Sequence, residues 1–174
     1  MNVIGIDPGI HGAVALVADD AAYVVDTPTL ERKVGRKIRR RVNVIELADA
    51  LTTFALPGTV AYVERAQASP RMGVSSSFAY GEAFGMVVGV LAHLHIETRF
   101  VSPSVWKREM GLVKPGAREL GRDEEREKGS ALELARKLYP QLADKLARAK
   151  DDGRADALLI AHWGCEQIEA AAAA

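Results

Sequence analysis

Five short apolar runs along this chain have the length and the bounding turn residues of β-strands. They cover residues 2–7, 13–18, 22–26, 59–63 and 97–101. The first three follow one another through tight turns, whereas helical segments separate the last two. This order predicts an α/β fold with a mixed five-stranded sheet. A three-strand antiparallel meander joins two parallel strands, and helices flank both faces.

Apolar positions with helical spacing predict the helices. They cover residues 44–55, 78–95, 104–110, 130–138 and 153–168. Asn43 has the chemistry of an N-cap for the first helix, and Glu46 follows three residues later, as in a capping box. Ser102 and Pro103 suit the cap and the first position of the third helix.

The second predicted helix, which we expect to be largely buried, follows a loop over residues 65–77 and has glycine at every fourth position. Gly81, Gly85 and Gly89 therefore share one face. A glycine costs a helix about 1 kcal/mol relative to alanine. We expect this face to let another backbone approach closely, either that of the sheet or that of a second subunit.

The composition is that of a single soluble domain. The chain has 174 residues, 48% of them hydrophobic and 26% charged, and we expect the domain to cover residues 1–169 with a frayed Ala-rich tail at 170–174. Cys165 is the only cysteine, so an intramolecular disulfide is impossible. We find no signal peptide and no run of about 18 apolar residues, which predicts a cytoplasmic protein without a membrane partner.

The formal net charge is zero, but cations are concentrated in the polar segment 29–41. Its basic residues, with no acid among them, are Arg32, Lys33, Arg36, Lys37, Arg39, Arg40 and Arg41. Gly35 interrupts the segment, which predicts a mobile loop or an extended arm. Blocks of like charge are usually solvated and often serve as interaction segments.

Acidic residues lie at the ends of two predicted strands and at the start of the last predicted helix. Asp7 ends the first predicted strand, Glu64 ends the fourth, and Asp156 lies in the first turn of the last helix. Asp152, four residues before Asp156, shares its helix face. If the first and fourth strands are neighbours, Asp7 and Glu64 emerge side by side.

Each acid alone has an ordinary structural explanation. Asp7 could start the Pro-Gly turn, Glu64 could pair with Arg65, and Asp152 could cap a helix. Acids at all three positions would repel one another unless a cation lay among them. Carboxylates suit Mg²⁺ or Mn²⁺, and two such ions support phosphodiester hydrolysis by an activated water.

Four motifs occur in an order that resembles the RuvC-type Holliday-junction resolvases, in particular phage-like members of this branch of the RNase H-like superfamily. They are IGIDPG at 4–9, VE at 63–64, VSPSVWK at 101–107 and ADAL at 155–158. The resemblance extends over roughly residues 2–163. It implies an RNase H-like fold, a homodimer, and Mg²⁺-dependent nicking of paired strands of a four-way DNA junction in the cytoplasm of a bacterial or phage-infected cell.

The resemblance also assigns roles to individual residues. Asp7 and Glu64 match the first two catalytic acids, Asp156 matches the last, and Lys107 matches a lysine near the scissile phosphate. A plain surface lysine is the alternative for Lys107. The family usually places an acid or histidine three residues before the last Asp, where this chain has Gly153.

Two departures from the family pattern follow. Asp152 is the expected substitute for the acid missing at Gly153, with Asp151 in reserve. Family members also often carry an aromatic wedge in the loop after the second acid, but residues 67–77 contain none. Met72 is the candidate apolar wedge.

The basic residues suit a DNA partner, because each cation that neutralises a phosphate adds salt-sensitive affinity. Segment 29–41 is the strongest candidate, followed by Arg65, Arg71 and Lys114. Two other functions remain open: a nuclease for other branched DNA, such as flaps or forks, and a junction-binding protein without catalysis. An ATP-binding domain of the actin type is disfavoured, because the chain is too short for two lobes.

Overall fold

The computed structural model describes residues 1–19, 21–65, 72–113 and 130–174. Its main sheet has five strands in the order β3-β2-β1-β6-β7. They are β1 (Asn2–Asp7), β2 (Ala13–Ala18), β3 (Ala21–Asp26), β6 (Val60–Glu64) and β7 (Glu97–Val101). β1, β2 and β3 pair antiparallel, whereas β1–β6 and β6–β7 are parallel. The predicted mixed sheet is confirmed.

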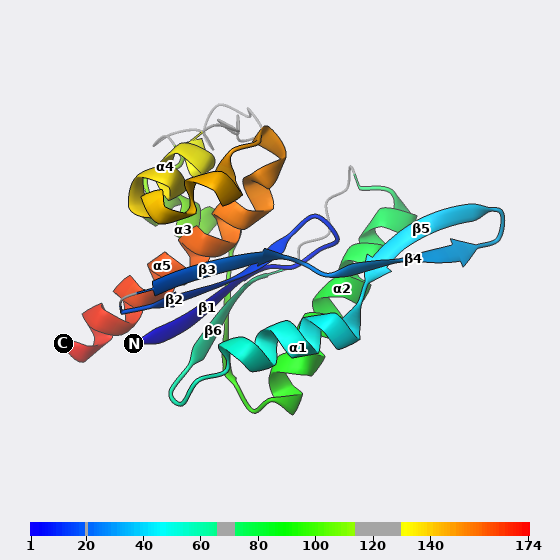
Figure 1. The fold of residues 1–174 in the computed structure, drawn as a ribbon. Helices are drawn as coiled ribbons and strands as arrows, with labels where there is room; N and C mark the ends of the chain where they lie inside the picture. The colour runs from blue at the N-terminus through cyan, green and yellow to red at the C-terminus, as the bar shows by residue number, and fades with distance from the viewer. Residues whose placement is uncertain (20, 66–71, 114–129) are drawn as a thin grey trace.

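β1 lies at the centre of the sheet and contributes to two separate cores. Val3 packs with the helix α5 (Asp152–Ala172) on one face, and Ile4 and Ile6 pack with helices α1 (Val44–Phe54) and α2 (Val74–His93) on the other. Alternate residues of a strand point to opposite faces, which explains this division. Figure 1 shows the helices on both sides of the sheet.

The helix α5 packs unusually close to β1. A Cβ atom added at Gly5 would lie 2.2 Å from the backbone oxygen of Ala157, so only glycine permits this approach. The remaining helical elements cover the same face of the sheet (Figure 1). They are α3 (Pro103–Glu109), α4 (Ser130–Leu138) and the 3₁₀ turns η1 (Pro140–Leu146) and η2 (Ala149–Asp151).

The predicted helix caps are found in part. The Asn43 side chain accepts from the Glu46 backbone N–H at 3.5 Å, at the start of α1. Pro103 is the first residue of α3, as expected, although the Ser102 side chain makes no capping bond there. The last helix, α5, continues to Ala172.

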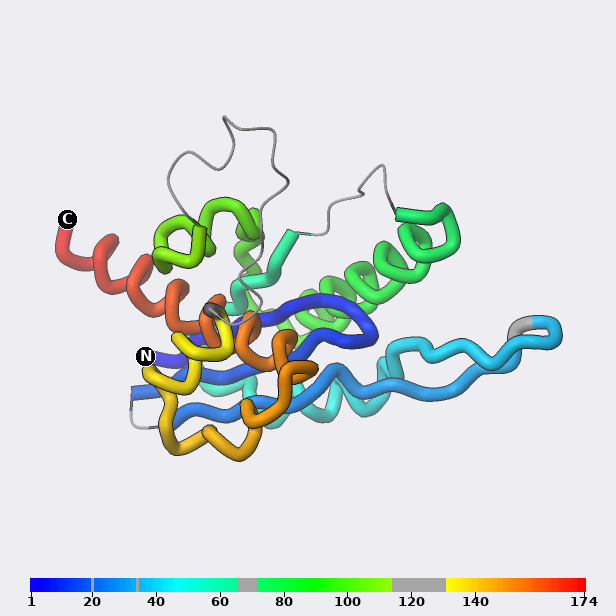
Figure 2. The backbone as a smooth tube through the Cα atoms, turned by 90° about the horizontal axis from the view of Figure 1, so that it is seen from above, coloured from blue at the N-terminus to red at the C-terminus, as the bar shows by residue number. Residues whose placement is uncertain are grey.

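The basic segment is a β-hairpin rather than a loop. Strands β4 (Thr29–Val34) and β5 (Lys37–Val42) form a separate two-stranded sheet that projects from the body of the protein (Figures 1 and 2). Gly35 lies in the turn with φ of +62°, a conformation that favours glycine. The arm alternative of the prediction is therefore correct, and we call residues 29–42 the arm.

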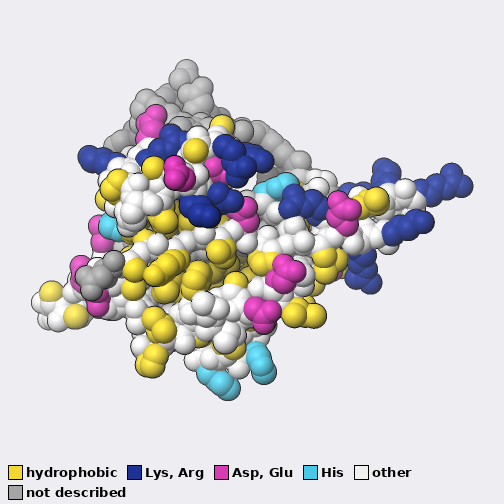
Figure 3. Space-filling view, viewed as in Figure 1, with side chains coloured by type: hydrophobic (Ala, Val, Ile, Leu, Met, Phe, Trp, Pro, Cys, Tyr) yellow, Lys and Arg dark blue, Asp and Glu magenta, His cyan; other side chains and the backbone are white. Residues whose placement is uncertain are grey.

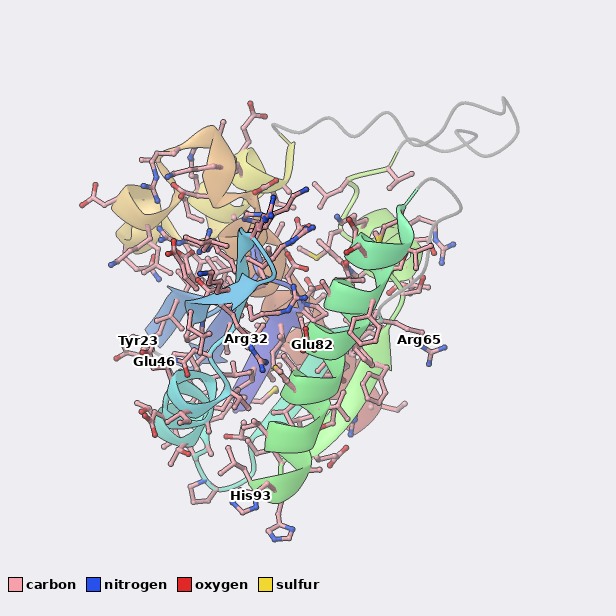
Figure 4. The ribbon with its side chains drawn as sticks, turned by 90° about the vertical axis from the view of Figure 1, so that its right-hand side faces the viewer. Tyr23, Arg32, Glu46, Arg65, Glu82 and His93 are labelled. Atoms are coloured by element: carbon pink, nitrogen blue, oxygen red, sulfur yellow. The ribbon has the colours of Figure 1, made fainter. Side chains whose placement is uncertain are left out.

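Helix α2 differs from its prediction in two ways. It begins at Val74, earlier than expected, and it is not largely buried, because only Ala83, Val87, Val90 and Leu91 are enclosed. Cβ atoms added at Gly81, Gly85 and Gly89 would meet nothing within 4 Å among the described residues. The sheet is therefore not the neighbour of the glycine face of α2, the helix that lies in front in Figure 4.

The same helix is the one described segment that is long and apolar enough to cross a bilayer, with a mean hydropathy of 1.3. Core helices of soluble proteins pass the same test, so this property does not identify a membrane span.

Glu82 on α2 forms a 2.9 Å ion pair with Arg41 of the arm.

Candidate functional site

Asp7 and Glu64 emerge side by side at one edge of the sheet. Ile6 and Val63, which precede them, are partners in the parallel β1–β6 pairing. Beyond Asp7 the chain turns back tightly, and the Gly12 N–H donates to the Gly9 carbonyl at 3.2 Å. A Cβ atom at Gly12 would lie 1.9 Å from the Asp7 backbone oxygen. Only glycine at position 12 therefore permits the chain to pass this close to Asp7.

The first turn of α5 brings two more acids to the same place. Asp152 and Asp156 line a cavity of about 500 Å³ together with Asp7. The opposite wall comes from the arm and from the start of α2, through Arg39, Arg40, Arg41, Ser75, Ser76 and Tyr80. Acids and arginines therefore face one cavity, which suits a phosphate group and cations that accompany it.

The electrostatics of Asp7 reflect this crowding. Burial raises the pKa of the Asp7 carboxyl well above its usual value, and the negative charges of Glu64, Asp156 and Asp152 raise it further. Lys107 acts in the opposite direction. A divalent cation would relieve the same repulsion, so the charge and the oxygen donors of this set suit Mg²⁺ or Mn²⁺.

Glu64 is held by a tryptophan. The carboxylate is buried, and its Oε2 accepts a 2.8 Å hydrogen bond from the indole Nε1 of Trp106 on α3. Trp106 is 0% exposed. A buried carboxylate needs donors to offset its lost hydration, and Trp106 supplies one of them.

Lys107, the next residue of α3, holds the acid on α5. Its Nζ lies 2.8 Å from Oδ2 of Asp156, and the two side chains are 14% and 15% exposed. The alternative of a plain surface lysine is therefore wrong. Nζ also lies 4.8 Å from the Trp106 ring centroid, at cation–π distance.

The bonds from Trp106 to Glu64 and from Lys107 to Asp156 keep these two acids apart. Within the described part of the chain, no three His, Cys, Asp or Glu side chains form a group that could hold a metal ion. Glu64 is turned toward Trp106, and Asp156 is turned toward Lys107. A cation at this site would compete with Lys107 for Oδ2 of Asp156 or bind the other oxygen of that carboxylate.

Asp151 and Asp152 have different surroundings. Asp151 is buried and accepts from the Arg148 backbone N–H and guanidinium, both at 2.8 Å. The hydrogen bond from the Arg148 side chain lowers the pKa of Asp151. Asp152 lines the cavity and acts on the Asp7 charge. The geometry therefore favours Asp152 as the fourth acid of the site and gives Asp151 a structural role.

The structure explains why position 153 carries no acid. A Cβ atom there would lie 2.4 Å from the His11 backbone oxygen and 3.0 Å from the Gly12 Cα. The turn after Asp7 thus packs directly on the first turn of α5. Any side chain at position 153 would therefore collide with this turn.

The sequence alone did not reveal several residues around the site. Arg154 donates to Asp26 at the end of β3, with Nη2 to Oδ2 at 2.6 Å, and so ties the first turn of α5 to the sheet. Ser75 and Ser76 were missed because the helix was expected to start at residue 78, and nothing in the sequence placed Tyr80 of that helix at the site. The VSPSVWK motif contained Trp106, but nothing in it indicated a hydrogen bond to Glu64.

The described DNA-binding candidates fall into three groups. Arg39, Arg40 and Arg41 line the cavity. Arg32, Lys33, Arg36 and Lys37 lie farther out on the arm, where dark blue side chains gather in Figure 3. Arg65 is exposed at the end of β6 and points away from the body in Figure 4. Arg71 and Lys114 lie outside the described residues. The candidate wedge Met72 lines the cavity.

Comparison with solved structures places this arrangement in a known fold. RuvC of T. thermophilus in complex with a Holliday junction substrate is 16% identical, with 97% of this chain and 96% of that chain covered and a TM-score of 0.58. The chain has the RNase H-like fold of RuvC. A second Thermus thermophilus RuvC structure is 13% identical, with 96% of both chains covered and a TM-score of 0.50. No protein-family model matches the chain, and no curated protein matches it in sequence.

Proposed function

We propose that this protein is a structure-selective DNA endonuclease that resolves four-way junctions by metal-dependent hydrolysis of paired phosphodiester bonds. The carrying observation is the convergence of Asp7, Asp152 and Asp156 on one cavity, beside Glu64 and opposite three arginines of the arm. The same fold in a RuvC bound to a Holliday junction supports this choice of substrate. The proposed setting is the cytoplasm of a bacterial or phage-infected cell.

Asp7, Glu64, Asp152 and Asp156 would hold Mg²⁺, with Mn²⁺ as a substitute and two ions per site. Such ions supply activation of the attacking water and stabilisation of the leaving oxygen. Burial and the neighbouring acids raise the pKa of Asp7, and a bound cation would lower it by offsetting the repulsion between the acids. Trp106 would keep Glu64 oriented toward the cation site.

Lys107 has a role on the substrate side of the site. Its Nζ is held near the acids by Asp156 and by the face of the Trp106 ring. An ammonium group at this position would neutralise negative charge that develops on the oxygens of the reacting phosphate.

The arm and Arg65 supply the DNA contacts outside the acid cluster. Arg39, Arg40 and Arg41 open onto the same cavity as the acids, so DNA in the site would touch the base of the arm. Phosphate contacts of this kind give affinity without sequence preference. Junction selectivity would then come from the geometry of two sites in a dimer.

The proposed dimer uses α2. Its open face carries Val74 and Phe78, which are 89% and 70% exposed, followed by Gly81, Gly85 and Gly89. In an antiparallel two-fold packing centred between residues 81 and 82, Phe78 lies opposite Gly85 of the partner subunit and Val74 lies opposite Gly89 of the partner subunit. Large side chains at one end therefore meet glycines at the other, which is the self-complementarity that two-fold symmetry requires.

Incubation with labelled DNA tests the function. Four-way junction, linear duplex and flap are each combined with Mg²⁺, Mn²⁺ or EDTA. We expect paired nicks confined to the junction and dependent on metal. Asp7→Asn should abolish nicking and keep junction binding.

Other outcomes point to the alternatives. Cleavage of flaps or forks in preference to junctions would indicate another branched-DNA nuclease, and binding without cleavage would indicate a junction-binding protein. Retained cleavage in Asp7→Asn would reject the assignment of the acids.

A further inference from the structure

The arm has two chemically different faces. In its antiparallel register, Arg32 is paired with Arg39, Lys33 with Ile38, and Glu31 with Arg40. Paired residues lie on the same face of a two-stranded sheet, and successive residues alternate between faces. The pairs at Arg32 and Lys33 therefore point in opposite directions.

The charged residues on one of these faces are all cationic. Within the two described strands this face carries Arg32, Lys37, Arg39 and Arg41 beside the apolar Leu30, and no acid; we call it the basic face. The opposite face mixes its charges. It carries Lys33 beside Ile38, and Glu31 lies across from Arg40, whose Nη2 donates to Thr29 at 2.7 Å.

The base of the arm is fixed to the site. The Thr27 N–H donates to the Gly12 carbonyl at 2.9 Å, and the Asn43 N–H donates to the Pro28 carbonyl at 2.8 Å. Gly12 belongs to the turn that follows Asp7, and Arg41 is paired with Glu82 of α2 at 2.9 Å. DNA held at the acids thus meets the arm in a set direction.

The reach of the arm matches a short length of duplex. Six residues at a rise of about 3.3 Å give a strand of roughly 20 Å. The same distance along a duplex is about six base pairs, at 3.4 Å each. A two-stranded ribbon fits the major groove, which is about 12 Å wide.

We propose that the arm is a β-ribbon that lies in the major groove of the duplex next to the cleaved phosphate, with its basic face toward the phosphates of the first six or so base pairs. This proposal rests on the proposed nuclease function and adds the part of the substrate that the arm binds. It assigns Arg32, Lys37 and Arg39 to backbone contacts and leaves Lys33 facing away from them.

Lys37 and Lys33 provide a matched pair for the test. They are the same residue type, both are exposed, and they lie near the same turn on opposite faces. Lys37→Ala and Lys33→Ala are compared in the Asp7→Asn background, so that binding is measured without cleavage. Lys137→Ala on α4, which is exposed and outside the arm and the cavity, is the neutral control.

Junction affinity is measured over a range of salt, first with normal DNA and then with uncharged methylphosphonates placed three to six or ten to twelve base pairs from the cleavage position. We expect Lys37→Ala to reduce the slope of log K against log salt by about one. We also expect it to reduce the sensitivity to the near methylphosphonates in part, because Arg32 and Arg39 remain on the same face. Lys33→Ala should change both by much less.

Equal effects of Lys37→Ala and Lys33→Ala would overturn the face assignment. Equal sensitivity to near and far methylphosphonates would overturn the ribbon placement. In both cases metal-dependent cleavage by the wild-type protein would leave the nuclease function intact. Loss of that function would show itself separately, as a wild-type protein that neither binds nor cuts any branched DNA.

Discussion

The buried indole of Trp106 donates a 2.8 Å hydrogen bond to Oε2 of Glu64. The second tryptophan of the chain makes a bond of the same type and length, from Trp163 to Oε2 of Glu109. Only the first of these carboxylates belongs to the candidate site. Substitutions at the two tryptophans can therefore be compared to separate the general effect of losing an indole donor from an effect on the candidate site.

Trp106→Phe should weaken Mg²⁺ binding by about 10- to 100-fold, the usual effect of removing a group that orients a metal ligand. The reason is that Glu64 loses a donor that fixes its orientation. Mg²⁺ binding by calorimetry is the main measurement, with junction cleavage as the second. Trp163→Phe is the matched control and should leave Mg²⁺ affinity unchanged. An equal loss in both variants would mean that Trp106 acts through stability alone.

Asp7→Asn should stabilise the metal-free protein, and the gain should grow with pH. Burial and the neighbouring acids raise the pKa of folded Asp7, so the stability that its protonated form provides is lost as the pH rises through that pKa. Asparagine cannot ionise and keeps this stability. The measurement is thermal unfolding in EDTA between pH 4 and pH 8. A gain that is independent of pH would contradict the electrostatic explanation.

Mg²⁺ should stabilise the wild-type protein more than it stabilises Asp7→Asn. The ion relieves the repulsion around Asp7, so it should raise the unfolding temperature of the wild-type protein at pH 8. In Asp7→Asn the same addition should have a much smaller effect. An equal Mg²⁺ response in both proteins would place the binding of the ion elsewhere.

Gly85→Leu should convert the proposed dimer to a monomer. The added side chain would occupy the space that Phe78 of the partner subunit fills, while the described residues of its own subunit leave that space open. Analytical ultracentrifugation measures the change, and circular dichroism checks that the subunit stays folded. Ile45→Ala, at a position 72% exposed on α1, is the control and should remain dimeric. A dimer that tolerates Gly85→Leu would rule out this packing.

Gly153→Asp restores an acid at the usual family position and should still damage the protein. The Cβ atom would meet the His11 carbonyl at 2.4 Å, and overpacking of this kind typically costs about 1–3 kcal/mol. We expect a lower free energy of unfolding in urea and slower cleavage. A fully stable, more active variant would show that the turn after Asp7 yields easily and that Asp152 is not required.

The fold and the positions of Asp7 and Glu64 at strand ends could be predicted from local sequence patterns. Short apolar runs joined by tight turns specify an antiparallel meander, and strands separated by helices favour parallel pairing. The proximity of Asp7 and Glu64 was thus predictable, because the ends of neighbouring parallel strands meet at one edge. The arm was only half predicted, because its charges indicated exposure and obscured the strand pairing.

The tertiary structure decided the details that make the site specific. The donor to Glu64 comes from a residue 42 positions away, and no periodicity relates two such positions. Which of Asp151 and Asp152 lines the cavity depends on which side of α5 meets the turn after Asp7, and the absence of a side chain at Gly153 has the same cause. Sequence periodicity determines which face of each element is apolar, whereas the close packing of distant elements determines which polar groups meet.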